Sequence, residues 1–130
     1  MIIEDYTGSL EQRMVKLNEV LRNQTDLVLI GSSYGGLMAG MYALDNAEKV
    51  RKMILLAPAL NLFEFKPYLR KQLHIPVMLY HGRQDDVVPP EAVHDIAQTV
   101  FLNLQYHLVE DDHPLNNTFK HMDWDNLIKF

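Results

Sequence analysis

The sequence contains no cysteine, and this absence excludes several kinds of chemistry. Disulfide bonds, thiol nucleophiles and thiolate metal sites all need that residue. The absence also fits a reducing compartment. The start of the chain, Met1 to Asp5, has neither the basic flank nor the long apolar region of a signal peptide. These features predict a cytoplasmic protein.

Long apolar runs and an excess of basic residues are missing as well. No apolar run approaches the ~20 residues that span a bilayer. The formal net charge of −5 argues against a non-specific nucleic-acid or membrane surface. The chain has no internal repeat, and its 130 residues suffice for one modest core. We therefore expect a single domain over residues 1–130, with neither nucleic acid nor membrane as a partner.

The chain does contain a glycine-rich turn between two apolar segments. Asp26–Ile30 predicts a buried strand, and Leu37–Leu44 is compatible with a helix. The residue at the apex of such a tight strand–helix turn is forced into a strained backbone conformation. The apex here is Ser33, within the sequence Gly31-Ser32-Ser33-Tyr34-Gly35-Gly36.

Small residues are expected two places on either side of Ser33, because strand and helix nearly collide there. Gly31 and Gly35 occupy those two places. Gly-x-Ser-x-Gly in a strand–turn–helix context is the pattern of a nucleophile elbow. Ser33 would then present its hydroxyl above the sheet, at the positive end of the following helix.

The rest of the chain predicts alternating helices and strands. A first helix is indicated by an apolar stripe after a Ser9–Gln12 capping box, and a later one by Pro89-Pro90. A last helix is expected over Asn116–Phe130. The stripe consists of Leu10, Met14, Leu17 and Leu21, and the further strands are Met53–Leu56, Val77–Tyr80 and Leu104–Val109. The fold class is therefore α/β, a mostly parallel sheet with helices on both faces.

The segment from Asn61 to His74 reads as one short helix or two turns. Its aromatic residues, Phe63, Phe65 and Tyr68, either lie over the turn at Ser33 or fill the edge of the core. The interval between Pro58 and Ile75 leaves no room for a large lid. An open site is therefore expected.

Residues suited to acid–base work follow later strands. A serine hydroxyl needs a nearby base, and that base needs a group to orient it. His113 follows the strand ending at Val109, and Asp85 and Asp86 follow the strand ending at Tyr80. Because the carboxyl ends of parallel strands share one edge, these groups should meet Ser33 there.

Other histidines are weaker candidates for the base. His121 falls in the predicted last helix, His94 in a helix and His107 in a strand, and we expect His81 to shape the turn beside Gly82. No His-x-x-x-His or His-Glu-x-x-His spacing is present, so neither a metal nor another cofactor is predicted.

Four segments in this order resemble the α/β-hydrolase superfamily, in particular its small, lidless, esterase-like members. They are Gly31-Ser32-Ser33-Tyr34-Gly35-Gly36, Leu55-Leu56-Ala57-Pro58-Ala59, His81-Gly82-x-x-Asp85-x-x-Val88-Pro89 and Asp111-Asp112-His113-Pro114-Leu115. The resemblance implies Ser33 as nucleophile, Asp85 rather than Asp86 as acid, and His113 as base. It also implies the Tyr34 N–H as an oxyanion donor. The implied activity is that of a carboxylesterase or thioesterase acting on a small acyl ester or thioester.

The sequence departs from the family before Ser33. The second oxyanion donor normally comes from an earlier loop, often with His-Gly, which this chain lacks, and Ile2-Ile3 would be the remnant of a strand. The fold is thus predicted to be N-terminally truncated, with a bare edge on the strand at 27–30. We expect either a homodimer that closes this edge or a true start upstream of Met1. The alternative function is an inactive hydrolase-like binding or interaction module.

Overall fold

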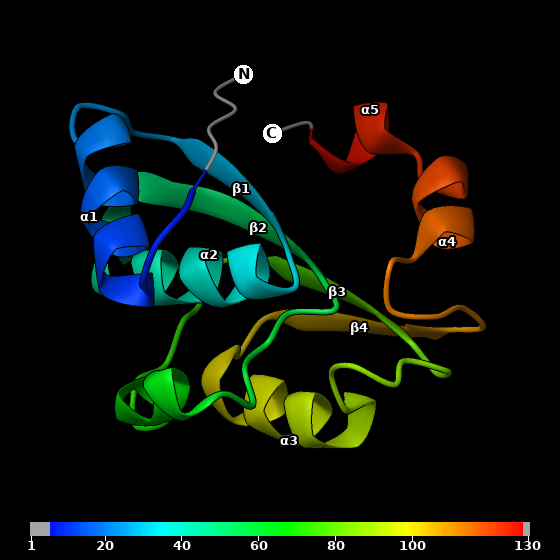
Figure 1. Cartoon of the computed structure of the whole chain (residues 1–130). Helices are drawn as coiled ribbons and strands as arrows, with labels where there is room; N and C mark the ends of the chain where they lie inside the picture. Colours follow the sequence, from blue (N-terminus) through cyan, green and yellow to red (C-terminus); the bar gives the residue numbers. More distant parts are fainter. Residues whose placement is uncertain (1–5, 129–130) are drawn as a thin grey trace.

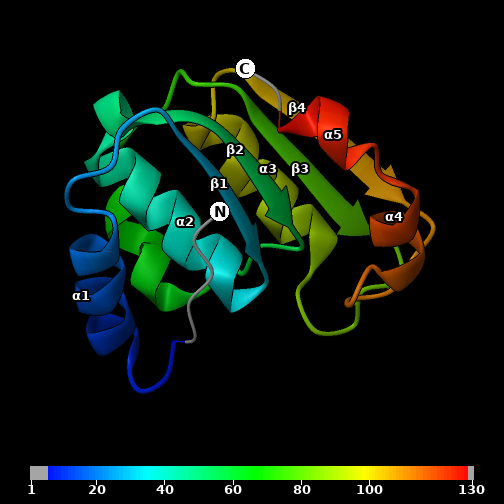
Figure 2. The same cartoon turned by 90° about the horizontal axis from the view of Figure 1, so that it is seen from above.

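The computed structural model describes residues 6–128, in which four parallel strands form one sheet (Figure 1). The strand tail expected at Ile2-Ile3 lies outside the described residues. Seen from above, the strands lie side by side in chain order and point the same way (Figure 2). They are β1 (Leu27–Ser32), β2 (Val50–Leu56), β3 (Val77–Gly82) and β4 (Leu104–Val109). The predicted α/β class with a parallel sheet is confirmed.

Three helices cover one face of the sheet. Because strand order follows chain order and crossovers between parallel strands are right-handed, successive connections return along the same face. The main core lies between this layer and the sheet (Figure 1). The helices are α1 (Leu10–Val20), α2 (Tyr34–Asp45) and α3 (Pro90–Val100). The short 3-10 helices η1 (Ala47–Lys49) and η2 (Phe63–Tyr68) lie in the connections that lead into β2 and β3.

Helix starts follow the expected local chemistry. The capping box at α1 is present: the Ser9 side chain accepts the Gln12 N–H, and the Gln12 side chain accepts the Ser9 N–H. The α3 helix begins at Pro90, where a proline costs no hydrogen bond. Its inner face is buried at Val93, Ala97 and Val100, and Ile96 is partly buried against the same core. No helix within residues 6–128 has the length and apolar character needed to cross a membrane.

The opposite face carries two short helices, α4 (Asn116–His121) and α5 (Trp124–Leu127) (Figure 1). The prediction of one last helix over Asn116–Phe130 was wrong, and Phe130 lies outside the described residues. The backbone is extended at Met122, and the Asp123 side chain then caps α5 by accepting the Asn126 N–H. A local side-chain cap thus restarts the helix in a new direction.

The aromatic residues of η2 do not cover the turn at Ser33. The Phe65 ring is fully buried in the core and packs beside Gly40 of α2. Tyr68 stacks on Phe65, and its hydroxyl donates to Asp45 at the far end of α2 from Ser33. Phe63 is 75% exposed. The core-edge alternative is therefore correct for Phe65.

Candidate active site

Ser33 lies at the sharp junction of β1 and α2. Its backbone has φ 54° and ψ −115°, a strained conformation for a residue with a side chain, as expected at the apex of this turn. The end of β2 holds the turn in place. The Ser33 N–H donates to the Leu56 carbonyl at 2.9 Å, and the Ser33 carbonyl accepts the Ala59 N–H at 2.9 Å.

The glycines around Ser33 are not equally constrained. A Cβ at Gly31 would lie 2.8 Å from the carbonyl carbon of Gly35, so strand and helix do collide there. The same expectation for Gly35 was wrong, because an added Cβ would meet no atom within 4 Å other than those of its neighbours and its own helix backbone. Gly36 is the second constrained position, since its Cβ would lie 2.6 Å from Cβ of Pro58. The backbone of Gly35, rather than its side-chain position, makes the close contact.

Asp85 lies in the loop that follows β3, and its carboxylate is fully buried. Oδ1 accepts the N–H groups of Val87 and Val88, each at 2.8 Å. Oδ2 lies 2.7 Å from Nδ1 of His113. Burial raises the pKa of Asp85, but the bonds from Val88, His113 and Val87 outweigh it and bring the pKa below its ordinary 3.8. The group is therefore a carboxylate that accepts on both oxygens.

His113 lies in the loop after β4, with 18% of its side chain exposed. Its Nε2 is 3.0 Å from Oγ of Ser33, and its Nδ1 faces Asp85. Because the Asp85 oxygen can only accept, Nδ1 carries the proton, and in the neutral ring Nε2 is free to accept the serine hydroxyl. The structure therefore brings Ser33, His113 and Asp85 into one hydrogen-bonded chain.

The loops bearing Asp85 and His113 are tied to each other. Gly82 allows the approach, because a Cβ there would lie 2.7 Å from the carbonyl oxygen of Asp112. The Gln84 N–H donates to the Asp111 carbonyl at 3.0 Å. The carboxylate of Asp111 accepts both the N–H and the hydroxyl of Thr118, each at 2.9 Å. These contacts fix the His113 loop between β3 and α4.

Asp86 and three of the other histidines lie away from this chain of hydrogen bonds, whereas His81 is buried beside Asp85. Nδ1 of His113 is bonded to Asp85, whereas Asp86 is exposed. Nδ1 of His121 bonds the Asn117 carbonyl within α4. His107 stacks on Tyr80 and His94 on Tyr106. Within residues 6–128 no group of three His, Cys, Asp or Glu side chains is placed to hold a metal ion.

Tyr34, the residue after Ser33, is the first residue of α2. The N–H groups in the first turn of a helix have no partner within the helix. They also lie at the positive end of the helix dipole. The Tyr34 N–H is therefore available as a donor to a negatively charged oxygen beside Ser33. Its ring lies under the Arg13 guanidinium, 4.7 Å from carbon to ring centroid.

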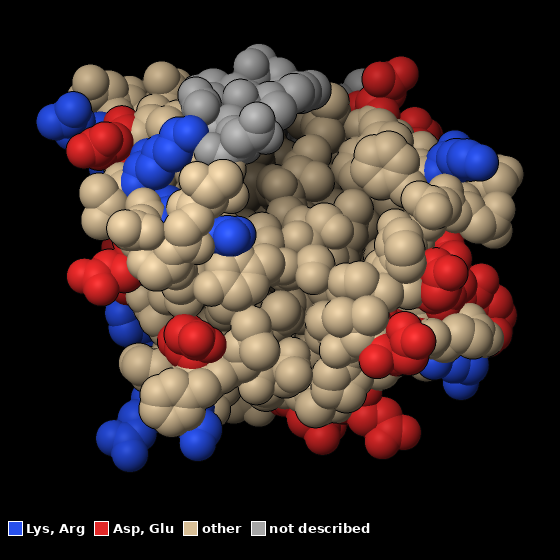
Figure 3. All heavy atoms as spheres, in the orientation of Figure 1, with Lys and Arg blue, Asp and Glu red and all other residues tan. Residues whose placement is uncertain are grey.

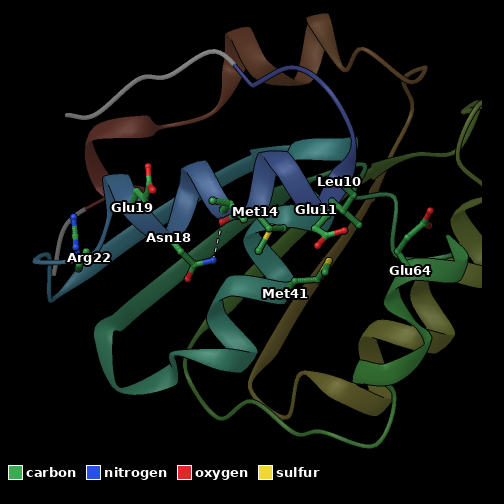
Figure 4. Close-up of a pocket in the computed structure, with 9 residues that line it drawn as sticks. Leu10, Glu11, Met14, Asn18, Glu19, Arg22, Met41 and Glu64 are labelled. Carbon is green, nitrogen blue, oxygen red and sulfur yellow. Dashed lines mark hydrogen bonds between the residues drawn. The ribbon is translucent and has the colours of Figure 1, made fainter.

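Two hollows lie outside the Ser33–His113–Asp85 chain. One, of about 710 Å³, has an apolar floor along α1 and a rim of Glu11, Glu19 and Glu64 (Figure 4). The other is a groove of about 830 Å³ beside β1, on whose far side lie Phe119 and Trp124. In Figure 3 the middle of this face is hollowed and uncharged. None of the three hydrogen-bonded residues lines either hollow.

Comparison with known proteins agrees with this architecture. A family model described as the alpha/beta hydrolase fold matches residues 13–74. A predicted CIB-like hydrolase from Thermoplasma acidophilum is 23% identical, with a TM-score of 0.73, and the match covers 92% of this chain and 60% of that one. The chain has the α/β-hydrolase fold.

Other solved hydrolases align in the same way. Alpha/beta hydrolase domain-containing protein 10 from mouse is 19% identical with a TM-score of 0.70, and 83% of this chain covers 63% of it. An esterase from Exiguobacterium antarcticum is 14% identical with a TM-score of 0.72, the match covering 91% of this chain and 72% of that one. The chain thus spans about three fifths of the length of the first two hydrolases. Comparison with curated proteins gives no match.

Sequence reasoning missed three residues that shape the surroundings of Ser33, Asp85 and His113. Gly36, Gly82 and Asp111 act through contacts with segments distant in the sequence. The available signals were Gly36 directly after the elbow and Gly82 and Asp111 within the two later motifs. None of these signals indicated which backbone would come close.

Proposed function

We propose that the chain is a serine hydrolase that cleaves a small ester or thioester through an acyl-enzyme. The observation that carries this proposal is the pair of contacts made by His113, 3.0 Å to Oγ of Ser33 and 2.7 Å to Oδ2 of Asp85. A base within reach of a hydroxyl, oriented by a carboxylate, is the arrangement that activates a serine. The named esterase and hydrolase neighbours give further support.

In the first half-reaction, Oγ of Ser33 attacks the acyl carbon while Nε2 of His113 takes the hydroxyl proton. The carbonyl oxygen becomes an oxyanion, which the Tyr34 N–H and the α2 dipole stabilise. The bond to the leaving oxygen or sulfur then breaks, and His113 returns the proton to it. The products are an alcohol or thiol and an ester on Ser33.

In the second half-reaction, water attacks the Ser33 ester and His113 takes a proton from that water. The Ser33 oxygen leaves and recovers the proton from His113, so the free acid and the starting enzyme are formed. Asp85 accepts from Nδ1 throughout and stabilises the imidazolium each time it forms. The scheme requires no cofactor.

The test is covalent labelling of the folded chain by a fluorophosphonate probe, which reacts with activated serines. We expect labelling that is lost in Ser33→Ala and strongly reduced in His113→Gln. Ser32→Ala is the matched control, since Ser32 belongs to the same turn and should keep the label. A label that persists in Ser33→Ala would contradict the proposal.

The second candidate is an inactive hydrolase-like binding module. The observation that favours it is the absence of any histidine before His74, and hence of a His-Gly loop ahead of Ser33. Loss of one oxyanion donor costs about 10²–10³ in rate. A folded chain that takes up no fluorophosphonate label would favour this candidate over the hydrolase.

A further inference from the structure

His81, the last residue but one of β3, is completely buried and lines neither hollow. Its Nε2 lies 3.0 Å from the Val88 carbonyl oxygen and 3.2 Å from Oδ2 of Asp85. Both of these atoms are acceptors, so Nε2 must carry the proton. His81 therefore donates to the Val88 carbonyl, and the same N–H lies beside the Asp85 carboxylate in the same loop.

The other ring nitrogen gives a second, independent observation. Nδ1 of His81 is buried and has no hydrogen-bond partner. Burying an unpaired polar atom is unfavourable, and an apolar side chain of similar size would avoid that cost. Packing alone thus does not account for a histidine here. The Nε2–H is the feature that an apolar residue could not supply.

We propose that His81 is a positioning residue that holds the Asp85 carboxylate, and the loop around it, so that Oδ2 stays aimed at His113. The inference rests on the proposed function for its catalytic consequence. Asp85 then accepts the Val87 and Val88 N–H groups on Oδ1 and bonds His113 through Oδ2, and Nε2 of His81 lies 3.2 Å from the same Oδ2. With both oxygens held, rotation of the carboxylate would break two or more bonds.

The protonation state of His81 fits this role. Burial lowers the pKa of His81 below its ordinary 6.5 and outweighs the opposing effects of Val88 and Asp85. A neutral ring with the proton on Nε2 donates to Asp85 without adding a second full charge beside His113. The titratable groups that face Asp85 are thus His81 from β3 and His113 from the loop after β4.

The test compares His81→Leu, which has no donor, with His81→Gln, whose amide nitrogen can take the place of Nε2. The rate of fluorophosphonate labelling of Ser33 is measured across pH for the parent and both variants. His81→Leu should lower the maximal rate by about ten- to a hundred-fold, the size expected for one hydrogen bond to a charged group. His81→Gln should recover most of that loss.

The acid limb of the same pH profile should move in His81→Leu and keep its parental position in His81→Gln, because only leucine leaves Asp85 without a donor at this position. His107→Leu is the control, because His107 stacks on Tyr80 in the neighbouring strand and does not touch Asp85. If His81 had only a packing role, His81→Leu and His81→Gln would lower the labelling rate equally, and the acid limb of the pH profile would stay in place. That result would overturn the proposal.

Histidine NMR of the parent separates this proposal from the proposed function. At neutral pH His81 should be neutral with its proton on Nε2, and the Nδ1–H signal of His113 should shift in His81→Leu. A charged His81, or one protonated on Nδ1, overturns the proposal even where Ser33 is reactive. An unreactive Ser33 with the expected NMR signals refutes the hydrolase and leaves the support of Asp85 by His81 standing. If His81→Leu does not fold, the histidine spectrum of the parent and the labelling rate of His81→Gln test the proposal.

Discussion

The backbone of Gly35 occupies the space that a side chain at Gly31 would need. A Cβ on Gly31 would lie 2.8 Å from the carbonyl carbon of Gly35 and 2.9 Å from Cα of Gly36. All of these are main-chain atoms of the elbow turn, so the clash cannot be relieved by rotating a side chain. The side-chain position of Gly35 is open. The two glycines of the motif therefore contribute in different ways.

Gly31→Ala should destabilise the fold, and Gly35→Ala should not. Overpacking against fixed backbone costs about 1–3 kcal/mol. Alanine in place of a helical glycine gains about 1 kcal/mol when nothing obstructs it. Urea unfolding of the two variants measures both effects. Equal losses of unfolding free energy in the two variants would contradict this account of the turn.

Asp85 and Asp86 provide a matched pair for the acid role. Asp85→Asn should lower the rate of fluorophosphonate labelling on the order of a thousand-fold or more, because an amide can hold His113 in the wrong tautomer. Asp86→Asn should label at about the parental rate, since Asp86 is exposed and His113 bonds Asp85. The measurement is the labelling rate at neutral pH. A larger loss in Asp86→Asn would reverse the assignment of the acid.

The convergence of Ser33, Asp85 and His113 could be predicted because each residue follows a strand. Parallel strands bring their carboxyl ends to one edge, so the order of strands and motifs is enough to place the three side chains together. The positions of Gly36 and Gly82 could not be read in this way. Gly36 is constrained by Cα and Cβ of Pro58, and Gly82 by the Asp112 carbonyl oxygen. Both contacts come from distant segments, so they are a property of the packed fold.

The position of Phe65 and the end of the last helix could not be predicted from the sequence either, because both depend on contacts that periodicity does not show. Periodicity alone left two positions open for Phe65, and only packing against Gly40 places it in the core. In the last segment, the apolar spacing continues through Met122, whereas the backbone leaves the helix there and Asp123 caps a new one. A single side-chain cap outweighed a weak helical pattern, since short helices have little stability of their own.

Stability should fall as the pH drops below about 6.5, because of His81. Burial lowers its pKa in the folded state below the ordinary 6.5, so the unfolded chain binds a proton that the folded chain does not. The contribution is fully present above pH 6.5 and is lost as the pH falls toward the folded-state pKa, by up to about 1.4 kcal/mol per pH unit.

Urea unfolding of the parent and His81→Gln at several pH values from 7.5 downward measures this effect. The difference between the two unfolding free energies should shrink on acidification. Carboxylates such as Asp85, whose pKa lies below 3.8, lose their contribution at lower pH and should not interfere above about pH 5. Two curves that stay parallel from pH 7.5 to 5 would show that His81 is not buried in neutral form.

The outer edge of β1 leads to the last prediction, that two copies of the chain pair through it. In the described part of the chain β1 pairs only with β2, its residues Leu27–Ser32 carry no charge, and Ile30 is 47% exposed beside the groove. Unpaired edges of this kind invite strand pairing, and a lysine blocks it.

Gel filtration with light scattering should give a dimer that Ile30→Lys converts to monomer. Leu108→Lys, on the opposite edge strand β4 and 37% exposed in the parent, should remain dimeric. A parent that is folded and monomeric at every concentration would refute the pairing, and dissociation by Leu108→Lys alone would move it to β4.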